Sequence, residues 1–76
     1  MQIRVKLMGT LRNKLPSGAT ALEVDAGTTV AAVLGRLGID GGHVHLVMVN
    51  GEMETERQRP LADGDELTVF PPVAGG

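Results

Sequence analysis

Residues 28–39 read Thr-Thr-Val-Ala-Ala-Val-Leu-Gly-Arg-Leu-Gly-Ile, and they contain the strongest helix signal in the chain. Their apolar residues recur at intervals of three and four, so they share one side of a helix: Val30, Val33, Leu34 and Leu37. Thr28 or Thr29 can cap the start of this helix, and Gly38 suits the position after its end. Gly35 inside the helix costs up to about 1 kcal/mol relative to alanine, which indicates that another segment packs closely there.

Alternating sequences before this helix predict two strands. Residues 2–8 alternate between polar and apolar side chains, which is the period of a half-buried strand, and residues 20–24 repeat that pattern. Gly9 ends the first of these runs, and residues 11–15 can form one short helical turn. The chain therefore places two strands ahead of its helix.

The sequence after the helix predicts a hairpin and a final strand. Residues 43–49 form a largely apolar run that stops at Asn50-Gly51, the pair typical of a type I′ hairpin turn. The return segment, residues 52–59, is so polar that only a short, solvated edge strand is expected there. A turn at Asp63-Gly64-Asp65 then precedes the last strand, over residues 66–70.

A single amphipathic helix must bury its apolar side against one face of the sheet that these strands form. We therefore predict an α+β fold over residues 1–70, with a mixed four- to five-stranded sheet and one main helix packed on one face. Residues 71–76 are expected to form an extended tail. The side chains expected between helix and sheet are Val5, Leu7, Leu22, Val30, Val33, Leu34, Leu37 and Leu67.

Composition narrows the function classes. The chain has 76 residues, enough for one domain, with 7 basic and 9 acidic residues and a net charge of −2. Mixed charges and a single aromatic residue argue against a nucleic-acid partner, which needs clustered positive charge and usually stacking side chains. No apolar run has membrane-spanning length, and the N-terminal residues lack a signal-peptide pattern, so we expect a cytoplasmic protein with no membrane partner.

Candidate metal and nucleophilic sites are weak. The chain has no cysteine, which excludes a disulfide framework, a thiolate metal site and a cysteine nucleophile. His43 and His45 share one side of the third predicted strand, but no third ligand is evident nearby. The acidic residues around Gly64 are better explained as a turn than as a calcium loop. We therefore expect no metal site. Met48 and Met53 are expected in the core or in an interface.

The tail carries the clearest functional signal: Pro71-Pro72-Val73-Ala74-Gly75-Gly76. The two prolines cannot donate ladder hydrogen bonds, so they end the last strand and favour a stiff, extended arm. The residues beyond them are small, and the final two lack a Cβ atom, which suits a narrow slot in another protein. We interpret the tail as an arm that presents the carboxylate of Gly76, although a frayed end without a role would share this composition.

Four short segments follow one another in order along the chain: Asn50-Gly51-Glu52, Pro60-Leu61, Asp63-Gly64-Asp65-Glu66-Leu67 and Phe70-Pro71-Pro72-Val73-Ala74-Gly75-Gly76. Together they resemble the small, sulfur-carrying subunit of molybdopterin synthase. That family has a ubiquitin-like β-grasp fold, which agrees with the order of elements predicted above. The family is similar in turn to the sulfur carrier of the thiamine pathway.

The resemblance implies a role for the tail. In the family, an E1-like adenylating enzyme uses ATP to activate the terminal glycine carboxylate, and a sulfur donor then converts it to a thiocarboxylate. The large subunit of molybdopterin synthase receives that sulfur to make the dithiolene of molybdopterin. On this reading Gly76 carries the reacting atom, Gly75 provides clearance, and Pro71 and Pro72 provide reach. The chain would bind no cofactor and would not be catalytic alone.

Relatives with the same tail leave other pathways open. They serve thiamine synthesis, tRNA thiolation, cysteine synthesis, tungsten cofactor synthesis or conjugation to lysines of proteins. Ala74 stands where many members of the family have serine, which bears on tail contacts more than on chemistry. A ubiquitin-like modifier or binding module is the alternative from a different functional class.

Strand alternation also predicts a partner surface. If Leu67 and Val69 face the helix, then Thr68 and Phe70 point to the opposite face, and Met8 joins them when the first and last strands are neighbours. Phe70, Met8 and Thr68 are therefore the expected partner-binding residues, and capping of the core is the alternative role for the aromatic ring. Other side chains expected on this face are Arg4, Lys6 and Glu66. The third strand adds one of two pairs: Val47 and Val49, or Leu46 and Met48.

Overall fold

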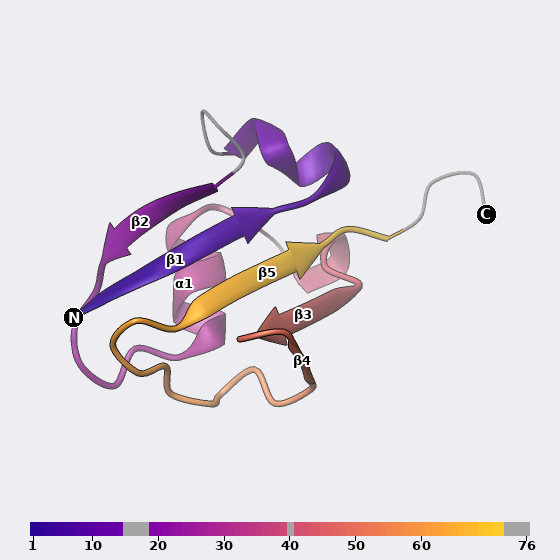
Figure 1. Ribbon diagram of the computed structural model, residues 1–76. Helices are drawn as coiled ribbons and strands as arrows, with labels where there is room; N and C mark the ends of the chain where they lie inside the picture. Colours follow the sequence, from indigo (N-terminus) through magenta and orange to yellow (C-terminus); the bar gives the residue numbers. More distant parts are fainter. Residues whose placement is uncertain (15–18, 40, 73–76) are drawn as a thin grey trace.

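The structure is a computed structural model that describes residues 1–14, 19–39 and 41–72 (Figure 1). Over these residues the chain forms a five-stranded mixed sheet with one α-helix on one face, as predicted. The strands are β1 (Gln2–Leu7), β2 (Ala19–Glu23), β3 (Leu46–Val49), β4 (Glu52–Glu54) and β5 (Glu66–Phe70). The helix is α1 (Val30–Arg36), and two short 3-10 helices are η1 (Gly9–Lys14) and η2 (Gly41–His43).

The first and last strands lie side by side in the middle of the sheet. The strand order is β2-β1-β5-β3-β4, in which β1 and β5 are parallel and every other pair is antiparallel. The register of the central pair sets Val5 beside Leu67 and Leu7 beside Val69. Since β5 is flanked on both sides, its far end is positioned by β1 and by β3 together.

The start of α1 is capped by its own sequence and by a distant loop. Thr29 Oγ1 accepts a hydrogen bond of 3.1 Å from the Ala32 N–H, which identifies Thr29 as the cap among the two predicted threonines. The N–H groups of Val30 and Ala31 donate to backbone carbonyls of Arg59 (3.1 Å) and Arg57 (2.8 Å). The loop before β5 therefore satisfies helix donors that would otherwise need water.

The end of α1 has the predicted glycine at the predicted place. Gly38 has φ +74° and donates to the Gly35 carbonyl at 3.1 Å, while the Ile39 N–H donates to the Leu34 carbonyl at 2.9 Å. This hydrogen-bond pattern is a Schellman motif, and Leu34 and Ile39 are both buried beside it. The expectation of close packing at Gly35 is wrong, because a Cβ atom there would meet no heavy atom within 4 Å.

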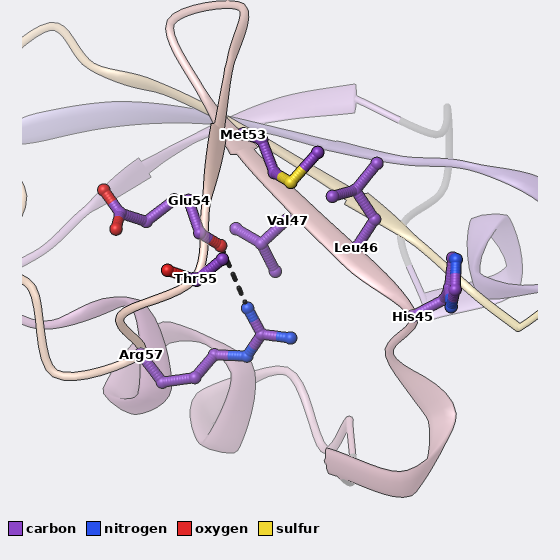
Figure 2. Close-up of a pocket in the computed structure, with 7 residues that line it drawn as sticks. All are labelled: His45, Leu46, Val47, Met53, Glu54, Thr55 and Arg57. Carbon is purple, nitrogen blue, oxygen red and sulfur yellow. Dashed lines mark hydrogen bonds between the residues drawn. The ribbon is translucent and has the colours of Figure 1, made fainter.

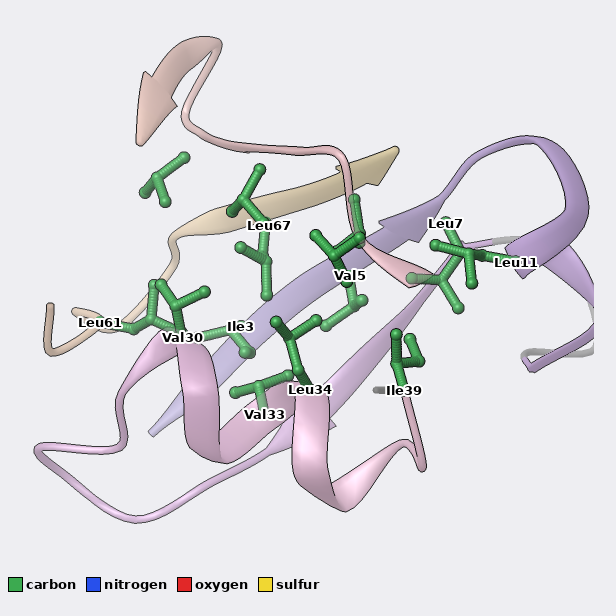
Figure 3. Packing of buried hydrophobic residues seen from close by; sticks show 14 of the residues in the cluster. Ile3, Val5, Leu7, Leu11, Val30, Val33, Leu34, Ile39, Leu61 and Leu67 are labelled. Atoms are coloured by element: carbon green, nitrogen blue, oxygen red, sulfur yellow. The ribbon is translucent and has the colours of Figure 1, made fainter. Parts of the chain in front are cut away.

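One apolar core fills the space between α1 and the sheet (Figure 3). Six of the eight predicted core residues are buried: Val5, Leu7, Val30, Val33, Leu34 and Leu67. Leu22 and Leu37 are only half-buried and pack against the edge of this cluster. The core also takes in residues from loops, among them Leu11, Ile39 and Leu61. Short strands and one short helix cannot close such a core alone, so the loops complete it.

The third strand differs from its prediction. It begins at Leu46 rather than at residue 43, because Gly41–His43 form a 3-10 turn in which the Val44 N–H donates to the Gly41 carbonyl at 3.2 Å. This local hydrogen bond competes with strand pairing and delays entry into the sheet. The hairpin that follows is as predicted, since Asn50 and Gly51 both have positive φ, +53° and +83°.

Candidate functional site

The face of the sheet opposite α1 carries the predicted partner-binding residues. Strand pairing places Lys6 beside Thr68 and Arg4 beside Glu66 on this face, while Val5 and Leu67 between them point into the core. Phe70 and Met8 continue the two rows at the ends of their strands. We call this the outer face. Its side chains are Arg4, Lys6, Met8, Leu46, Met48, Met53, Glu66, Thr68 and Phe70.

An apolar strip runs across the outer face from β5 to β4, made of Phe70, Leu46, Met48 and Met53. Leu46 pairs with Phe70, and Met48 pairs with both Thr68 and Met53. β3 therefore contributes Leu46 and Met48 to this face, while Val47 and Val49 are buried in the core. Met53 is 67% exposed, so of the two places expected for it, the core is excluded and an interface stays a prediction. Phe70 is half-buried and does not belong to the buried core cluster.

Charge is distributed unevenly beside the apolar strip. Arg4 and Lys6 on β1 are exposed on the outer face, and no acidic residue occurs among residues 1–14. Glu66 lies beside Arg4 on the same face. Glu52 and Glu54 of β4 pair with the buried Val49 and Val47, so they lie on the opposite face of the sheet. The outer face is therefore charged along β1 and at the start of β5, and apolar toward β3 and β4.

The base of the predicted arm is held from both neighbouring strands. The Met8 N–H donates to the Val69 carbonyl at 3.0 Å, and the His45 N–H donates to the Phe70 carbonyl at 2.8 Å. Pro71 follows immediately, and Figure 1 shows this end of β5 leaving the body of the domain. Pro71 is half-buried, whereas Pro72 is exposed. The remaining predicted tail residues lie outside the described residues: Val73, Ala74, Gly75 and Gly76.

Gly9 packs directly against the first proline of the arm. A Cβ atom built on Gly9 would lie 2.9 Å from Pro71 Cγ and 3.5 Å from Pro71 Cδ. Gly9 also has φ +56°, a left-handed conformation that favours glycine. Sequence reasoning identified Gly9 only as the end of a strand, because nothing in the local pattern links it to a residue near the other end of the chain.

A second structural feature that was not predicted from the sequence is the link that holds the start of β5. Asp65 is buried, its Oδ1 accepts from the Asn50 side chain at 2.9 Å, and its Oδ2 accepts from the Ala62 N–H at 2.8 Å. The Ala62 hydrogen bond, and then that from Asn50, lower the pKa of Asp65 below its ordinary value. The available signal was Asp63-Gly64-Asp65 directly before a strand, but it indicated only a turn.

A shallow pocket of about 230 Å³ lies at the open edge of β3 and β4 (Figure 2). Its lining residues are His45, Leu46, Val47, Met53, Glu54, Thr55 and Arg57. Arg57 Nη1 donates to the Glu54 carbonyl at 3.3 Å, and Arg59 forms an ion pair with the Glu54 carboxylate. The hydrogen bond from Arg59 lowers the pKa of Glu54. These contacts engage Glu54 and Arg57, and the other polar side chains that line the pocket are those of His45 and Thr55.

In residues 1–14, 19–39 and 41–72, no group of three or more His, Cys, Asp or Glu side chains is placed to hold a metal ion. No helix within those ranges has the length and apolar character needed to cross a membrane.

Comparison with known proteins gives one family and one fold. The model of the ThiS family matches residues 5–76, whereas no curated protein sequence matches the chain significantly. The HVO 2177 protein of Haloferax volcanii superposes with a TM-score of 0.81 at 29% identity, covering all of this chain and 87% of that one. The small archaeal modifier protein 1 of the same organism gives 0.76 at 27% identity, covering 95% and 98%.

A third solved structure is similar at lower identity. It is the complex of subunits 1 and 2 of the molybdopterin-converting factor from Helicobacter pylori, with a TM-score of 0.67 at 21% identity and complete coverage of both chains. At this identity the likeness shows the shared fold.

Proposed function

Because the chain belongs to the ThiS family, we propose that it is a sulfur carrier that bears sulfur as a thiocarboxylate on Gly76. The observation that carries this proposal is the junction of β5 with Pro71 and Pro72. A central strand, held on both sides, leads directly into two residues that cannot continue the sheet and that direct the chain away from it. Such a junction suits an arm that must reach into another protein.

Activation explains why the proposed carrier needs a partner. A carboxylate resists nucleophiles because of its negative charge and because oxide is a poor leaving group. An E1-like adenylating enzyme would let the Gly76 carboxylate attack the α-phosphorus of ATP, with release of pyrophosphate. A hydrosulfide equivalent from a sulfur donor would then attack the carbonyl carbon, so that a C–S bond forms, the C–O bond to AMP breaks, and the thiol proton is lost. The missing Cβ of Gly76 leaves the carbonyl open to this attack.

For the destination of the sulfur, we favour molybdopterin synthesis. The support is the ordered resemblance from Asn50 to Gly76 and the fold shared with the molybdopterin-converting factor complex of Helicobacter pylori. On this proposal the partner that accepts the sulfur is a synthase large subunit. Delivery to thiamine, thiolated tRNA, cysteine or a tungsten cofactor uses the same activated tail.

Protein modification is the second candidate function. It is favoured by the likeness to the small archaeal modifier protein 1 at 27% identity. The activation step would be shared, but a lysine amine would attack the activated Gly76 carbonyl in place of sulfur and leave an isopeptide bond. The two candidates therefore differ in the product and not in the first step.

The outer face is the proposed docking surface for the adenylating enzyme and the large subunit. Phe70 lies beside the arm, Thr68 and Met8 lie near it on the same face, and Met53 adds a largely exposed apolar side chain. An exposed apolar strip with a polar border suits a protein partner. The arm then contributes placement, while the outer face contributes most of the affinity.

Intact-mass measurement tests the proposal. The chain is incubated with the adenylating enzyme of its own organism, ATP and sulfide, and we expect the mass to rise by the difference between one sulfur and one oxygen atom. Deletion of Gly76 should leave folding and partner binding intact but abolish the mass change, because misplacement by about 1 Å can cost about 10²-fold in rate. Gly76→Trp should fail through steric exclusion from the slot. An equal mass change in the deletion variant, or none in the wild type, contradicts the carrier proposal.

A further inference from the structure

The contact between Gly9 and Pro71 joins the turn after β1 to the first residue of the arm. β1 ends at Leu7, and the chain reverses at Gly9, which is the first residue of η1. At this reversal a Cβ atom would lie 2.9 Å from Pro71 Cγ. A real Cβ atom does not approach another carbon so closely, and Pro71 Cγ belongs to a ring tied to the backbone. A side chain at residue 9 would therefore have to move the proline itself.

The residues just before Pro71 leave it little freedom to move in the other direction. The Val69 carbonyl is bound by the Met8 N–H, and the Phe70 carbonyl is bound by the His45 N–H at 2.8 Å. Leu46, the first residue of β3, pairs with Phe70, so His45 and Leu46 together hold the last residue of β5. The proline ring fixes its own φ and restricts Phe70 to extended conformations. The junction is thus held by β3 on one side and by the Gly9 turn on the other.

We propose that Gly9 is a positioning residue for sulfur transfer. Its missing side chain lets the Pro71 ring pack against the turn after β1, and this contact between Gly9 and Pro71, which we call the seat, sets the direction of the arm. The inference rests on the proposed carrier function. An error in the direction of Pro71 is passed on to the residues that follow it, and a misplacement of about 1 Å at the reacting carbonyl is enough to slow the reaction. Displacement of that size at a reacting carbon costs about 10- to 100-fold in rate.

The competing explanation is that Gly9 serves only its own backbone conformation. Its φ of +56° lies in the left-handed region, where asparagine is tolerated far better than alanine. Gly9→Asn therefore avoids most of the backbone strain that Gly9→Ala would cause, but it still adds the Cβ atom that meets Pro71. Gly27 provides the matched control, because it has φ +86° and no heavy atom within 4 Å of its own Cβ position.

The experiment compares six proteins: wild type, Gly9→Asn, Gly9→Ala, Gly27→Asn, Pro71→Ala, and Gly9→Asn combined with Pro71→Ala. Each protein is incubated with the adenylating enzyme, ATP and sulfide, and the steady-state rate of sulfur gain is measured from the change in intact mass. We expect both Gly9 variants to lower kcat by about 10- to 100-fold with KM changed by less than about 2-fold, since the outer face is untouched. Gly27→Asn should keep the wild-type kcat. The double variant should have almost the same kcat as Pro71→Ala alone, because the proline ring that Gly9→Asn displaces is already absent.

Nuclear Overhauser effects test the seat without any enzyme. The wild type should show contacts between the Gly9 Hα protons and the Pro71 ring, and the contacts from residue 9 to that ring should change in the Gly9 variants. Absence of the wild-type contacts, or an unmoved Pro71 in the variants, overturns the seat. A wild-type kcat in Gly9→Asn overturns its role in transfer but leaves the carrier function standing. A wild type that never gains sulfur contradicts the carrier function and with it the role in transfer, and the seat is then judged by the Overhauser contacts.

Discussion

The Asn50 side-chain amide donates a 2.9 Å hydrogen bond to the carboxylate of Asp65, and so ties the β3–β4 hairpin to the start of β5. Asn50 Oδ1 in turn accepts from the Glu66 N–H at 2.9 Å. Asn50 therefore has two roles, as the first residue of the hairpin turn with φ +53° and as a cross-link between two turns. Because β5 leads into the arm, this pair anchors the strand at the end opposite to the proposed reactive group.

The Asp65 link should make stability depend on pH. Its hydrogen bonds from Ala62 and Asn50 lower the pKa of Asp65 in the folded state. The stabilisation is therefore complete above the unfolded pKa of about 3.9 and is lost as the pH falls through the lower folded pKa. We expect Asp65→Asn to lower the free energy of unfolding by about 1–3 kcal/mol at pH 7, with the difference shrinking below about pH 3. Urea unfolding at both pH values measures it, with Asp25→Asn in an exposed turn as the control. If Asp65→Asn lowers the free energy of unfolding by the same amount at pH 7 and below about pH 3, the proposed role of the Asp65 carboxylate is contradicted.

Truncation at the centre of the helix interface should be costly. Leu34 is 5% exposed, lies in the last turn of α1 and belongs to the same core cluster as Ile39. We expect Leu34→Ala to reduce the free energy of unfolding by about 2–5 kcal/mol, because the cavity left behind cannot fully collapse. Leu37→Ala, at a half-buried position of the same helix end, should cost clearly less. Equal losses in the two variants, measured by urea unfolding, would contradict the position of the core.

Gly35 is a site where a substitution should stabilise the protein. It lies within α1, and an added Cβ atom meets nothing within 4 Å. Gly35→Ala should therefore raise the free energy of unfolding by about 0.5–1 kcal/mol, by reducing the entropy of the unfolded chain. Gly38→Ala is the matched control and should destabilise, since Gly38 has φ +74° at the helix end. Thermal unfolding of the two variants should shift in opposite directions. A lower melting temperature for Gly35→Ala would show that the helix needs glycine there.

Phe70 should matter more for binding than for folding. It lies on the outer face beside Leu46 and outside the buried core cluster. If the outer face docks the adenylating enzyme, Phe70→Ala should weaken Kd by at least about 10-fold, with a loss of stability of less than about 1.5 kcal/mol. Calorimetric titration measures Kd, and Glu56→Ala, on the exposed loop after β4, is the control. An unchanged Kd with either partner would remove Phe70 from the docking surface.

Local patterns in the sequence were sufficient for α1, for the hairpin turn and for the faces of β1 and β5, but not for the start or the faces of β3. The spacing of Val30, Val33 and Leu34, and the glycine at residue 38, predicted α1 and its end, because helix hydrogen bonds join residues only a few positions apart. Asn50-Gly51 predicted the hairpin for the same reason. The two-residue period of β5 placed Phe70 opposite the core before any neighbour was known, since alternation is a property of a single strand.

Tertiary structure alone decided the contacts between residues that are distant in sequence. The strand order sets β5 beside β1, and only that arrangement brings Pro71 against Gly9. The same holds for Asn50 and Asp65, which are 15 residues apart and meet because two turns share one end of the sheet. No local period encodes such pairs, so the sequence could indicate that an arm exists but not what holds its base. What holds the base of the arm depends on which strands lie next to one another in the packed sheet.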